Sequence, residues 1–391
     1  MDTIASSTEI RPFTYHAPQA ELDELRRRVL AARLPEQETV SDRSQGVRSA
    51  TVRELAHYWA AEYDWRKVEA TMNAHPQFIT EIDGLDIHFI HVRSRHEKAL
   101  PLLITHGWPA SIVALLKVID PLTNPTAHGG EASDAFDVII PSLPGYGFSG
   151  KPATTGWGPA RIARAWAVLM DRLGYARYVA QGGDWGAITT DLMAAQGHPG
   201  LIGMHTNLPG AVPSDVDVAA FTGSEPPPGL SEEEGLAFEQ LSLTYKNVQY
   251  AFFMGARPQA LSALGDSPVG LATFMLDPPL ISRIFEGQAG SLTRDDILDN
   301  ITLFWLTNTA VSAARLYWEN KVAFFAPKNV TIPVAVSVFP DELYQAPRSW
   351  VERAYPGLVH YRKLEKGGHF PAWEQPGLFV SELRAGFNSL R

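Results

Sequence analysis

The sequence contains no cysteine among its 391 residues, which excludes disulfide bonds, thiolate catalysis and cysteine-ligated zinc. It has no excess of basic residues either, because 33 lysines and arginines face 43 aspartates and glutamates for a net charge of −10. This balance argues against a nucleic-acid partner. No apolar run approaches the roughly 18 residues of a membrane-spanning helix, and the first residues lack the basic and apolar pattern of a secretion signal. We therefore expect a cytoplasmic protein without a membrane anchor.

The composition of the chain is that of a globular protein. Hydrophobic residues make up 45% and charged residues 19% of it, which favours a folded chain over a disordered or fibrous one. The length exceeds that of one compact core, so we expect one large domain with sizeable insertions or an appended segment. The acidic balance suits a soluble protein with a neutral ligand.

The first hundred residues contain helical patterns and one hairpin. Apolar residues recur at helical spacing from Gln19 to Arg33, and Thr51 with Glu54 has the spacing of a capping box at the start of a second helix. Residues 78–93 alternate on either side of Asp83-Gly84, which predicts a β-hairpin. We interpret this segment as a structural extension that packs on the rest of the protein.

The next part of the chain alternates between strands and helices. Short apolar runs end in glycine- and proline-rich corners, and helix-length stretches such as 159–173 and 186–197 lie between them. This alternation predicts an α/β fold with a mostly parallel sheet flanked by helices, which binds ligands beyond the carboxyl ends of its strands.

The alternation stops at Pro209, where mostly helical sequence begins. Ser231 and Glu234 form a capping-box pattern within it, and a strand pattern resumes at Ile332. We predict a helical lid inserted into the sheet domain. The predicted parts are an N-terminal extension, a first core segment, the lid and a second core segment, at 1–96, 97–209, 210–322 and 323–391.

Asp184 stands at a corner that follows a strand and precedes a helix. The surrounding residues, QGGDWG from Gln181 to Gly186, resemble the elbow on which esterases present a nucleophilic serine, with small residues that allow the strained turn. An aspartate here could serve as a carboxylate nucleophile, and the helix N-terminus would keep it ionised. It could equally cap the following helix.

A second corner, His106-Gly107-Trp108-Pro109, also follows a strand and matches the loop that supplies an oxyanion donor in such folds. The backbone N–H groups of Trp108 and Trp185 would then converge on Asp184. The alternative interpretation is an ordinary glycine-proline turn.

His369, in the segment KGGHF after the predicted last strand, has the chain order expected for the histidine of a hydrolase triad. An imidazole there would activate water for attack on an acyl-enzyme. The third member should follow the preceding strand, where Asp341 and Glu342 are adjacent. Their side chains point in different directions, so only one can hold the imidazole, and the residues alone leave both open.

Taken together, these motifs resemble the epoxide hydrolases of the microsomal type, including the fungal, bacterial and juvenile-hormone branches. The resemblance is carried by the N-terminal segment from Asp64 to Ser94 and by HGWP, GGDWG, FPDE, GGHF and DSPVGLA at 266–272. It implies an α/β-hydrolase fold with an inserted helical lid and an N-terminal extension, and it requires no metal or organic cofactor. The family's acid is the fourth residue of its FPxE/D motif, which is Glu342 here.

The resemblance also assigns two tyrosines of the lid. Tyr250, eight residues before Pro258, and Tyr317 in RLYWEN match the tyrosines that donate hydrogen bonds to the epoxide oxygen in the family. Each could otherwise be an aromatic residue of the lid core. The family often has a polar histidine or glutamine between these landmarks, whereas Met254 stands here, which we expect to change the shape of the pocket or its preference.

The resemblance implies an enzyme that converts an epoxide and water to a vicinal diol. Tyr250 and Tyr317 hold the epoxide oxygen, Asp184 forms the ester, and His369, oriented by Glu342, activates water. Aromatic residues of the lid and elbow predict a bulky apolar or aryl epoxide, with substrate contacts from Phe252, Phe253 and Trp305. Bacterial relatives serve detoxification and secondary metabolism, including enediyne assembly, and the sequence does not separate these roles.

Three other functions are compatible with parts of the pattern. A haloalkane dehalogenase shares the aspartate nucleophile, but a halide needs no proton and hence no tyrosine pair. An esterase would have serine in place of Asp184. A ligand-binding protein on the same scaffold would show no turnover on any epoxide. The sequence leaves homo-oligomer formation open.

Overall fold

The computed structural model of the chain describes residues 8–278 and 292–391. Within these ranges nine strands form one sheet in the order β1-β2-β3-β5-β4-β6-β7-β8-β9. The first three pairings are antiparallel, and all pairings from β5 to β9 are parallel. The predicted mostly parallel α/β sheet is therefore confirmed. The strands are β1 (Ile10–Phe13), β2 (Gln77–Ile82), β3 (Leu85–Val92), β4 (Leu100–Thr105), β5 (Phe136–Pro141), β6 (Tyr178–Gly182), β7 (Leu201–Thr206), β8 (Val334–Val338) and β9 (Leu358–Lys363).

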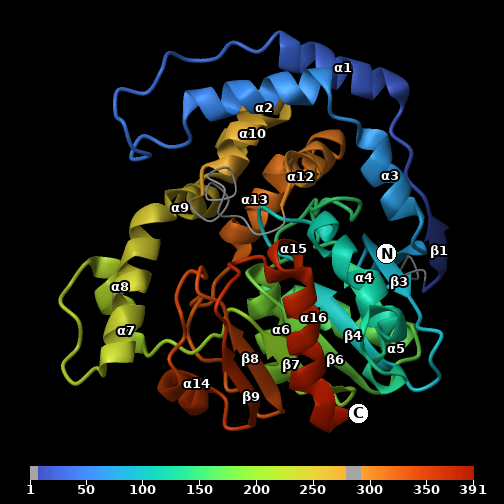
Figure 1. Cartoon of the computed structure of the whole chain (residues 1–391), viewed down its shortest axis with the longest axis vertical. Coiled ribbons are helices and arrows are strands. Elements are labelled where there is room, and N and C mark those ends of the chain that lie inside the picture. Colours follow the sequence, from blue (N-terminus) through green and yellow to red (C-terminus); the bar gives the residue numbers. More distant parts are fainter. Residues whose placement is uncertain (1–7, 279–291) are drawn as a thin grey trace, which may run out of the picture.

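Helices cover both faces of the sheet (Figure 1). Side chains along a strand alternate between its two faces. In β4, Leu103 accordingly packs in the cluster formed with α5 and α6, whereas Leu102 and Ile104 pack in the cluster formed with α4 and α16. The core is therefore double, with one apolar layer on each side of the sheet. The core helices are α4 (Leu116–Thr123), α5 (Pro159–Arg172), α6 (Trp185–Gln196), α14 (Arg348–Ala354), α15 (Pro371–Glu374) and α16 (Pro376–Phe387).

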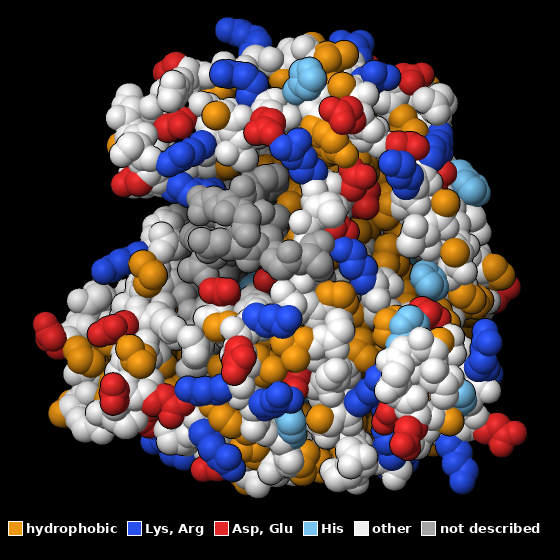
Figure 2. Space-filling view, viewed as in Figure 1, with side chains coloured by type: hydrophobic (Ala, Val, Ile, Leu, Met, Phe, Trp, Pro, Cys, Tyr) orange, Lys and Arg blue, Asp and Glu red, His pale blue; other side chains and the backbone are white. Residues whose placement is uncertain are grey.

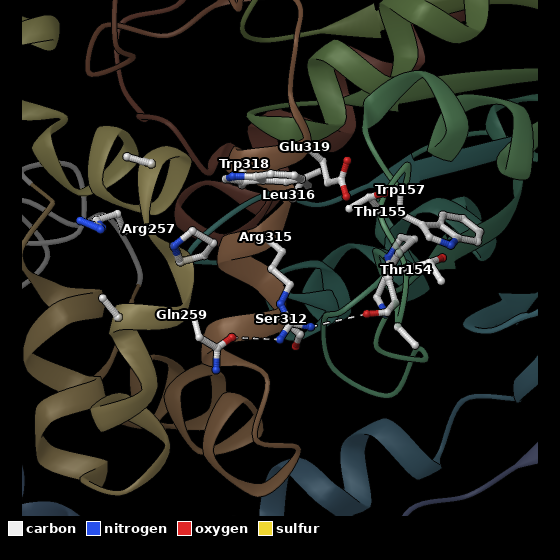
Figure 3. Close-up of a pocket in the computed structure, with 16 residues that line it drawn as sticks. Thr154, Thr155, Trp157, Arg257, Gln259, Ser312, Arg315, Leu316, Trp318 and Glu319 are labelled. Carbon is white, nitrogen blue, oxygen red and sulfur yellow. Dashed lines mark hydrogen bonds between the residues drawn. The ribbon is translucent and has the colours of Figure 1, made fainter.

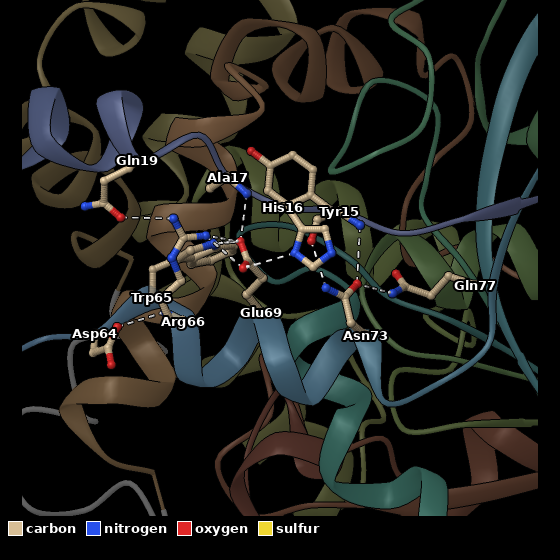
Figure 4. Close-up of polar contacts among 10 residues, drawn as sticks. All are labelled: Tyr15, His16, Ala17, Gln19, Asp64, Trp65, Arg66, Glu69, Asn73 and Gln77. Carbon is tan, nitrogen blue, oxygen red and sulfur yellow. Dashed lines mark hydrogen bonds and ion pairs between the residues drawn. The ribbon is translucent and has the colours of Figure 1, made fainter.

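The N-terminal segment contributes β1 and three helices, α1 (Gln19–Leu30), α2 (Ser49–Ala61) and α3 (Trp65–Asn73). The buried carboxylate of Glu69 on α3 accepts hydrogen bonds from the Ala17 N–H at 2.7 Å and the Trp65 indole at 3.1 Å, and Arg66 lies beside it (Figure 4). This carboxylate therefore ties the segment before α1 to α3.

The start of α2 differs from the prediction. The helix begins at Ser49 rather than at Thr51, and its N-cap residue, Arg48, makes no side-chain capping bond. The Ser49 N–H and hydroxyl instead bind the Glu38 carboxylate at 3.0 and 2.9 Å. A distant carboxylate thus takes over the capping function that the local pattern placed at Thr51. The predicted hairpin is confirmed, with β2 and β3 meeting at Asp83-Gly84.

The helices between β7 and β8 begin beside the sheet, where the first two lie, and continue into the space between the sheet and the N-terminal helices (Figure 1). Residues 279–291 of the predicted lid fall outside the described residues, and the predicted domain boundaries stay predictions. The capping box of Ser231 and Glu234 is confirmed. The helices are α7 (Ser214–Thr222), α8 (Glu232–Asn247), α9 (Gln249–Ala256), the 3-10 helix η4 (Pro258–Gly265), α10 (Pro268–Leu276), α12 (Arg294–Leu306) and α13 (Ala310–Glu319).

The lid is attached to the N-terminal helices through α12. The Trp59 indole donates to the Thr302 hydroxyl at 3.1 Å, and the Tyr63 hydroxyl donates to Asp299 at 2.8 Å. These bonds join elements more than 200 residues apart in sequence. The N-terminal segment therefore fixes the lid over the sheet.

Acidic and basic side chains are interspersed over the face shown in Figure 2, with hydrophobic side chains between them. No helix within 8–278 or 292–391 combines the length and the apolar character needed to cross a membrane.

Candidate active site

Asp184 occupies a strained corner between β6 and α6. Its φ of 53° and ψ of −127° lie outside the regions that a non-glycine residue prefers. The corner closes only because its neighbours are small: a Cβ on Gly182 would lie 2.0 Å from the Gly186 carbonyl oxygen, and one on Gly186 would lie 2.1 Å from that of Thr105. The glycines around Asp184 are thus required by the close approach of the backbone.

The Asp184 side chain does not cap α6. It makes no capping hydrogen bond to that helix. One oxygen, Oδ1, accepts the Trp108 N–H at 2.7 Å, and the other, Oδ2, lies 3.1 Å from Nε2 of His369. The structure therefore decides against the capping interpretation and leaves a buried carboxylate, 6% exposed, between an N–H donor and an imidazole.

The second predicted oxyanion donor is not engaged in the same way. Among the hydrogen bonds of the described residues, none joins the Trp185 N–H to the Asp184 carboxylate. The predicted role of this N–H belongs to the hydrolysis of the ester. An oxyanion hole stabilises the negative charge that develops on the carbonyl oxygen in the transition state, and not the resting carboxylate.

A residue of the lid holds the loop that carries Trp108. The Asn300 side chain, on α12, donates to the Pro109 carbonyl at 2.6 Å and accepts the Ser111 hydroxyl at 2.7 Å. Asn300 could not be predicted from the sequence, because nothing in the local sequence places α12 against this loop. On the core side, His106 accepts the Leu143 N–H at 3.1 Å.

Glu342 is the carboxylate that the structure places on His369. Its Oε1 binds Nδ1 of the imidazole, and its Oε2 accepts the Asn207 amide at 2.8 Å. The neighbouring Asp341 is exposed, whereas Glu342 is 7% exposed. The geometry thus agrees with the prediction of Glu342, and it adds Asn207, which no motif of the sequence indicates.

The charge on His369 is set by two opposing effects. Burial alone would lower the pKa of the imidazole, but the carboxylates of Glu342 and Asp184 on either side outweigh it and raise the pKa to about 10. At neutral pH the resting site therefore contains an imidazolium between two carboxylates. The nearby His106 differs, because burial lowers its pKa to about 4 and keeps it neutral.

Tyr250 on α9 and Tyr317 on α13 lie together against the two tryptophans that flank Asp184. The Tyr250 ring stacks on Trp108 with centroids 4.8 Å apart, and the Tyr317 ring meets Trp185 edge-on at 4.7 Å. The two tyrosine rings are 6.4 Å apart. Burial raises the pKa of both phenols, with the charge of Asp184 adding to it, so both remain protonated donors at neutral pH.

The predicted substrate contacts lie elsewhere on the lid. Phe252 and Phe253 are 47% and 43% exposed, and Phe252 packs on Phe221 at the surface. The Trp305 ring lies under Arg28 of α1, with the guanidinium 5.8 Å from its centroid. These positions give the prediction no support.

The rings that do extend the aromatic wall around the tyrosine pair come from other positions. Phe274 meets Trp108 at 5.8 Å, and Phe324 meets Trp185 at 5.4 Å. Met254, the departure from the family pattern, is buried on α9 at 1% exposure.

Two cavities adjoin the tyrosine-bearing helices. One, of about 160 Å³, is bordered by Tyr250 and Glu342 together with Leu243, Thr244 and Leu343. The larger, of about 570 Å³, lies beside α13, where Arg315 bridges Gln259 and the Pro152 carbonyl (Figure 3). Only the first is bordered by members of the site around Asp184.

Comparison with known proteins gives similarities over nearly the whole chain. Residues 10–115 match the family "Epoxide hydrolase N terminus" and residues 101–296 match the family "alpha/beta hydrolase fold". The chain is 48% identical to a protein of Stigmatella aurantiaca (strain DW4/3-1) named "Putative epoxide hydrolase", across 98% of this chain and 86% of the relative. It is 33% identical to "Epoxide hydrolase 1" of Oryctolagus cuniculus, across 96% and 88% of the two chains.

Solved structures give the same result. The juvenile hormone epoxide hydrolase of the silkworm Bombyx mori superposes with a TM-score of 0.87 at 30% identity, covering 99% of this chain and 96% of that chain. The epoxide hydrolase of Aspergillus niger superposes with a TM-score of 0.83 at 29% identity, covering 99% and 98%. The similarity therefore includes the N-terminal segment and the lid as well as the sheet.

Proposed function

This chain belongs to the epoxide hydrolases of the microsomal type, and from that premise we propose that Asp184 opens the epoxide by forming a covalent ester. The observation that carries the proposal is the orientation of its carboxylate. Oδ1 is fixed by the Trp108 N–H, and Oδ2 lies 3.1 Å from Nε2 of His369. A carboxylate held between an N–H donor and an imidazole is positioned for nucleophilic attack and for later release.

In the first step an oxygen of Asp184 attacks a ring carbon, and the carbon–oxygen bond of the strained ring breaks. The departing alkoxide takes a proton from Tyr250 or Tyr317. Both phenols have raised pKa values, so they hold this proton until the alkoxide forms. The product of the step is a hydroxyalkyl ester of Asp184.

Ester formation changes the charge next to His369. The negative charge of Asp184 is one of the interactions that raise the pKa of the imidazole, and the ester removes it. The pKa of His369 therefore falls, and the proton that it releases restores the tyrosine. His369 enters the second step as a neutral base, still oriented by Glu342.

In the second step water gives one proton to His369 and its hydroxyl group to the ester carbonyl carbon. Trp108 and Trp185 stabilise the oxyanion with their N–H groups. The intermediate expels the diol oxygen, which takes the remaining proton of the attacking hydroxyl. Asp184 and the protonated His369 are regenerated, and the sum is epoxide plus water to vicinal diol.

The substrate that we propose is a bulky apolar or aryl epoxide. The walls around the tyrosine pair are aromatic, with Trp108, Trp185, Phe274 and Phe324 in ring contact with the site. Burial of a phenyl ring there is worth roughly 2–3 kcal/mol, which corresponds to a preference on the order of 10² in kcat/KM for styrene oxide over 1,2-epoxypropane. Equal kcat/KM for the two epoxides would contradict this substrate class.

The ester route is tested by one turnover with excess enzyme in ¹⁸O-labelled water. Because water attacks the carbonyl of the enzyme, the label should appear in the Asp184 peptide and not in the first diol released. Enzyme incubated in the same water without epoxide is the control. Label in the first diol and none in the peptide would mean direct attack of water on the epoxide.

A further inference from the structure

One motif of the core, Pro144-Gly145-Tyr146-Gly147, has no part in the mechanism above. It forms the loop after β5, and its two glycines have φ values of +81° and +49°, which favour glycine. A Cβ on Gly145 would lie 2.8 Å from the Ser312 carbonyl oxygen. The Ser312 hydroxyl in turn donates to the Gly145 carbonyl at 2.6 Å. The loop is therefore pressed against α13, the helix that carries Tyr317.

This loop buries Tyr146 completely. Its exposure is 0%, and its ring meets the rings of His106 and Phe304 edge-on at 5.4 and 6.0 Å. Its hydroxyl has no hydrogen-bond partner among the residues that the structure describes. A buried hydroxyl without a partner is costly, and phenylalanine would fill the same space without that cost.

The phenol lies near the nucleophile, because its ring meets that of His106, and the next residue, Gly107, is in direct contact with Asp184. The charge of Asp184 acts on Tyr146, where burial first and then this charge raise the phenol pKa. Tyr146 in turn contributes to the raised pKa of Tyr317, after burial, Tyr250 and Asp184. It is therefore a neutral phenol at assay pH, able to donate and to accept one hydrogen bond.

The other polar groups around Asp184 already have partners or tasks. The Trp108 N–H donates to Oδ1 of Asp184, and the Glu342 carboxylate binds Nδ1 of His369. In the ester the two lid tyrosines face the former epoxide oxygen. The water that attacks the ester needs a second acceptor besides His369 Nε2. Two buried groups near Asp184 have no hydrogen-bond partner among the described residues, the Tyr146 hydroxyl and the Trp185 indole N–H, and of the two only the hydroxyl can accept a hydrogen.

We propose that the Tyr146 hydroxyl holds the hydrolytic water, accepting one of its hydrogens while His369 accepts the other. This inference rests on the ester route proposed above. It explains why the sequence places a tyrosine with an unsatisfied hydroxyl in a loop that two left-handed glycines and Ser312 hold in place.

The test is Tyr146→Phe, followed by rapid quenching and intact-mass measurement with styrene oxide. The growth and decay of the alkyl-enzyme give the two rates separately. We expect ester hydrolysis to slow at least about 10-fold, since a water without its second anchor loses the position and orientation needed for attack. Ester formation should stay within about twofold, and the melting temperature should equal or exceed that of the wild type, because the variant removes an unpaired hydroxyl.

The matched control is Tyr178→Phe at the other end of β6, where the hydroxyl contacts Nδ1 of His198 at 3.3 Å. It should leave both rates unchanged and should not raise the melting temperature. Unchanged hydrolysis in a folded Tyr146→Phe enzyme would overturn the proposal, as would a slowing confined to ester formation. If the wild type itself shows no alkyl-enzyme and the first diol that it releases contains ¹⁸O, the ester route itself is overturned.

Discussion

The backbone N–H of Trp108 donates to Oδ1 of Asp184 at 2.7 Å, which leaves Oδ2 free to face His369 at 3.1 Å. The contact depends on the residue before Trp108. A Cβ on Gly107 would lie 2.1 Å from Oδ1, 2.3 Å from Cβ and 2.5 Å from Cγ of Asp184. The oxyanion loop and the elbow are therefore in direct contact, and the glycine of the HGWP motif is what allows the nucleophile to reach its position.

Gly107→Ala should therefore displace the nucleophile. A misplacement of about 1 Å costs on the order of 10²-fold in rate, so we expect ester formation in a single turnover to fall by at least that factor. The matched control is Gly235→Ala on α8, where an added Cβ meets nothing within 4 Å. It should keep full activity and gain up to about 1 kcal/mol of stability from the better helix former. Near-normal ester formation in Gly107→Ala would contradict the arrangement.

Glu342→Gln tests the partner of His369. The amide keeps the shape but loses the charge that raises the pKa of the imidazole to about 10, so that pKa should fall. The histidine also loses its orientation and its stabilised imidazolium form, and ester hydrolysis should slow on the order of 10²-fold. The alkyl-enzyme should then accumulate, visible as an increase in intact mass equal to one epoxide.

The adjacent Asp341→Asn provides the control, because Asp341 is exposed and the structure places Glu342 on the imidazole. We expect it to turn over without an accumulated adduct. Accumulation in Asp341→Asn and not in Glu342→Gln would reverse the assignment.

Tyr250→Phe and Tyr317→Phe should each slow ester formation by about 10²-fold, and the double variant by more, because each phenol donates to the departing alkoxide. Burial raises the pKa of both, so the wild-type rate of ester formation should not decline up to about pH 10 through loss of these protons. Tyr245→Phe on α8, whose hydroxyl binds Asp217, is the control and should form ester at the wild-type rate. A double variant that opens epoxides normally would exclude the donor role and revive displacement of a leaving group that needs no proton.

The parts of the site that the sequence predicted are those set by short local segments. Asp184, Trp108 and His369 each lie in the segment that follows a parallel strand, within six residues of its end, and the carboxyl ends of parallel strands meet at one edge of a sheet. Strand order and chain order alone therefore bring them together. Glu342 needed the family resemblance, because the choice between two adjacent carboxylates depends on side-chain direction.

The parts that could not be predicted depend on how the lid lies on the core. Asn300 and Phe274 reach the HGWP loop through contacts between segments more than 160 residues apart, which no local pattern encodes. Helix periodicity gives no support to the prediction of Phe252 and Phe253 as substrate contacts. Tyr250 and Met254, four residues apart, share the inner face of α9, so the two phenylalanines between them face outward.

The bond between Tyr63 and Asp299 predicts a pH dependence of stability. Burial, with Asp295 and Asp296 adding, raises the pKa of Asp299 to about 7 from its ordinary value of 3.8. Between these values the folded protein binds a proton more readily than the unfolded chain, so the contribution of this group is most favourable at low pH and is lost as pH rises through 7. Above pH 7 the folded protein contains a costly buried charge at the junction of the lid and the N-terminal helices.

Asp299→Asn removes that charge and keeps an oxygen that can accept the Tyr63 hydroxyl. The variant should be more stable than the wild type at pH 8, and its advantage at pH 8 should exceed that at pH 5 by about 1–2 kcal/mol, or a few degrees in melting temperature. Asp296→Asn, which breaks the 2.8 Å ion pair with Lys117, should instead lower stability at pH 8. The measurement is chemical denaturation of the three proteins at both pH values. An advantage of Asp299→Asn that does not grow between pH 5 and pH 8 would show that this carboxyl does not titrate in the folded protein as its burial requires.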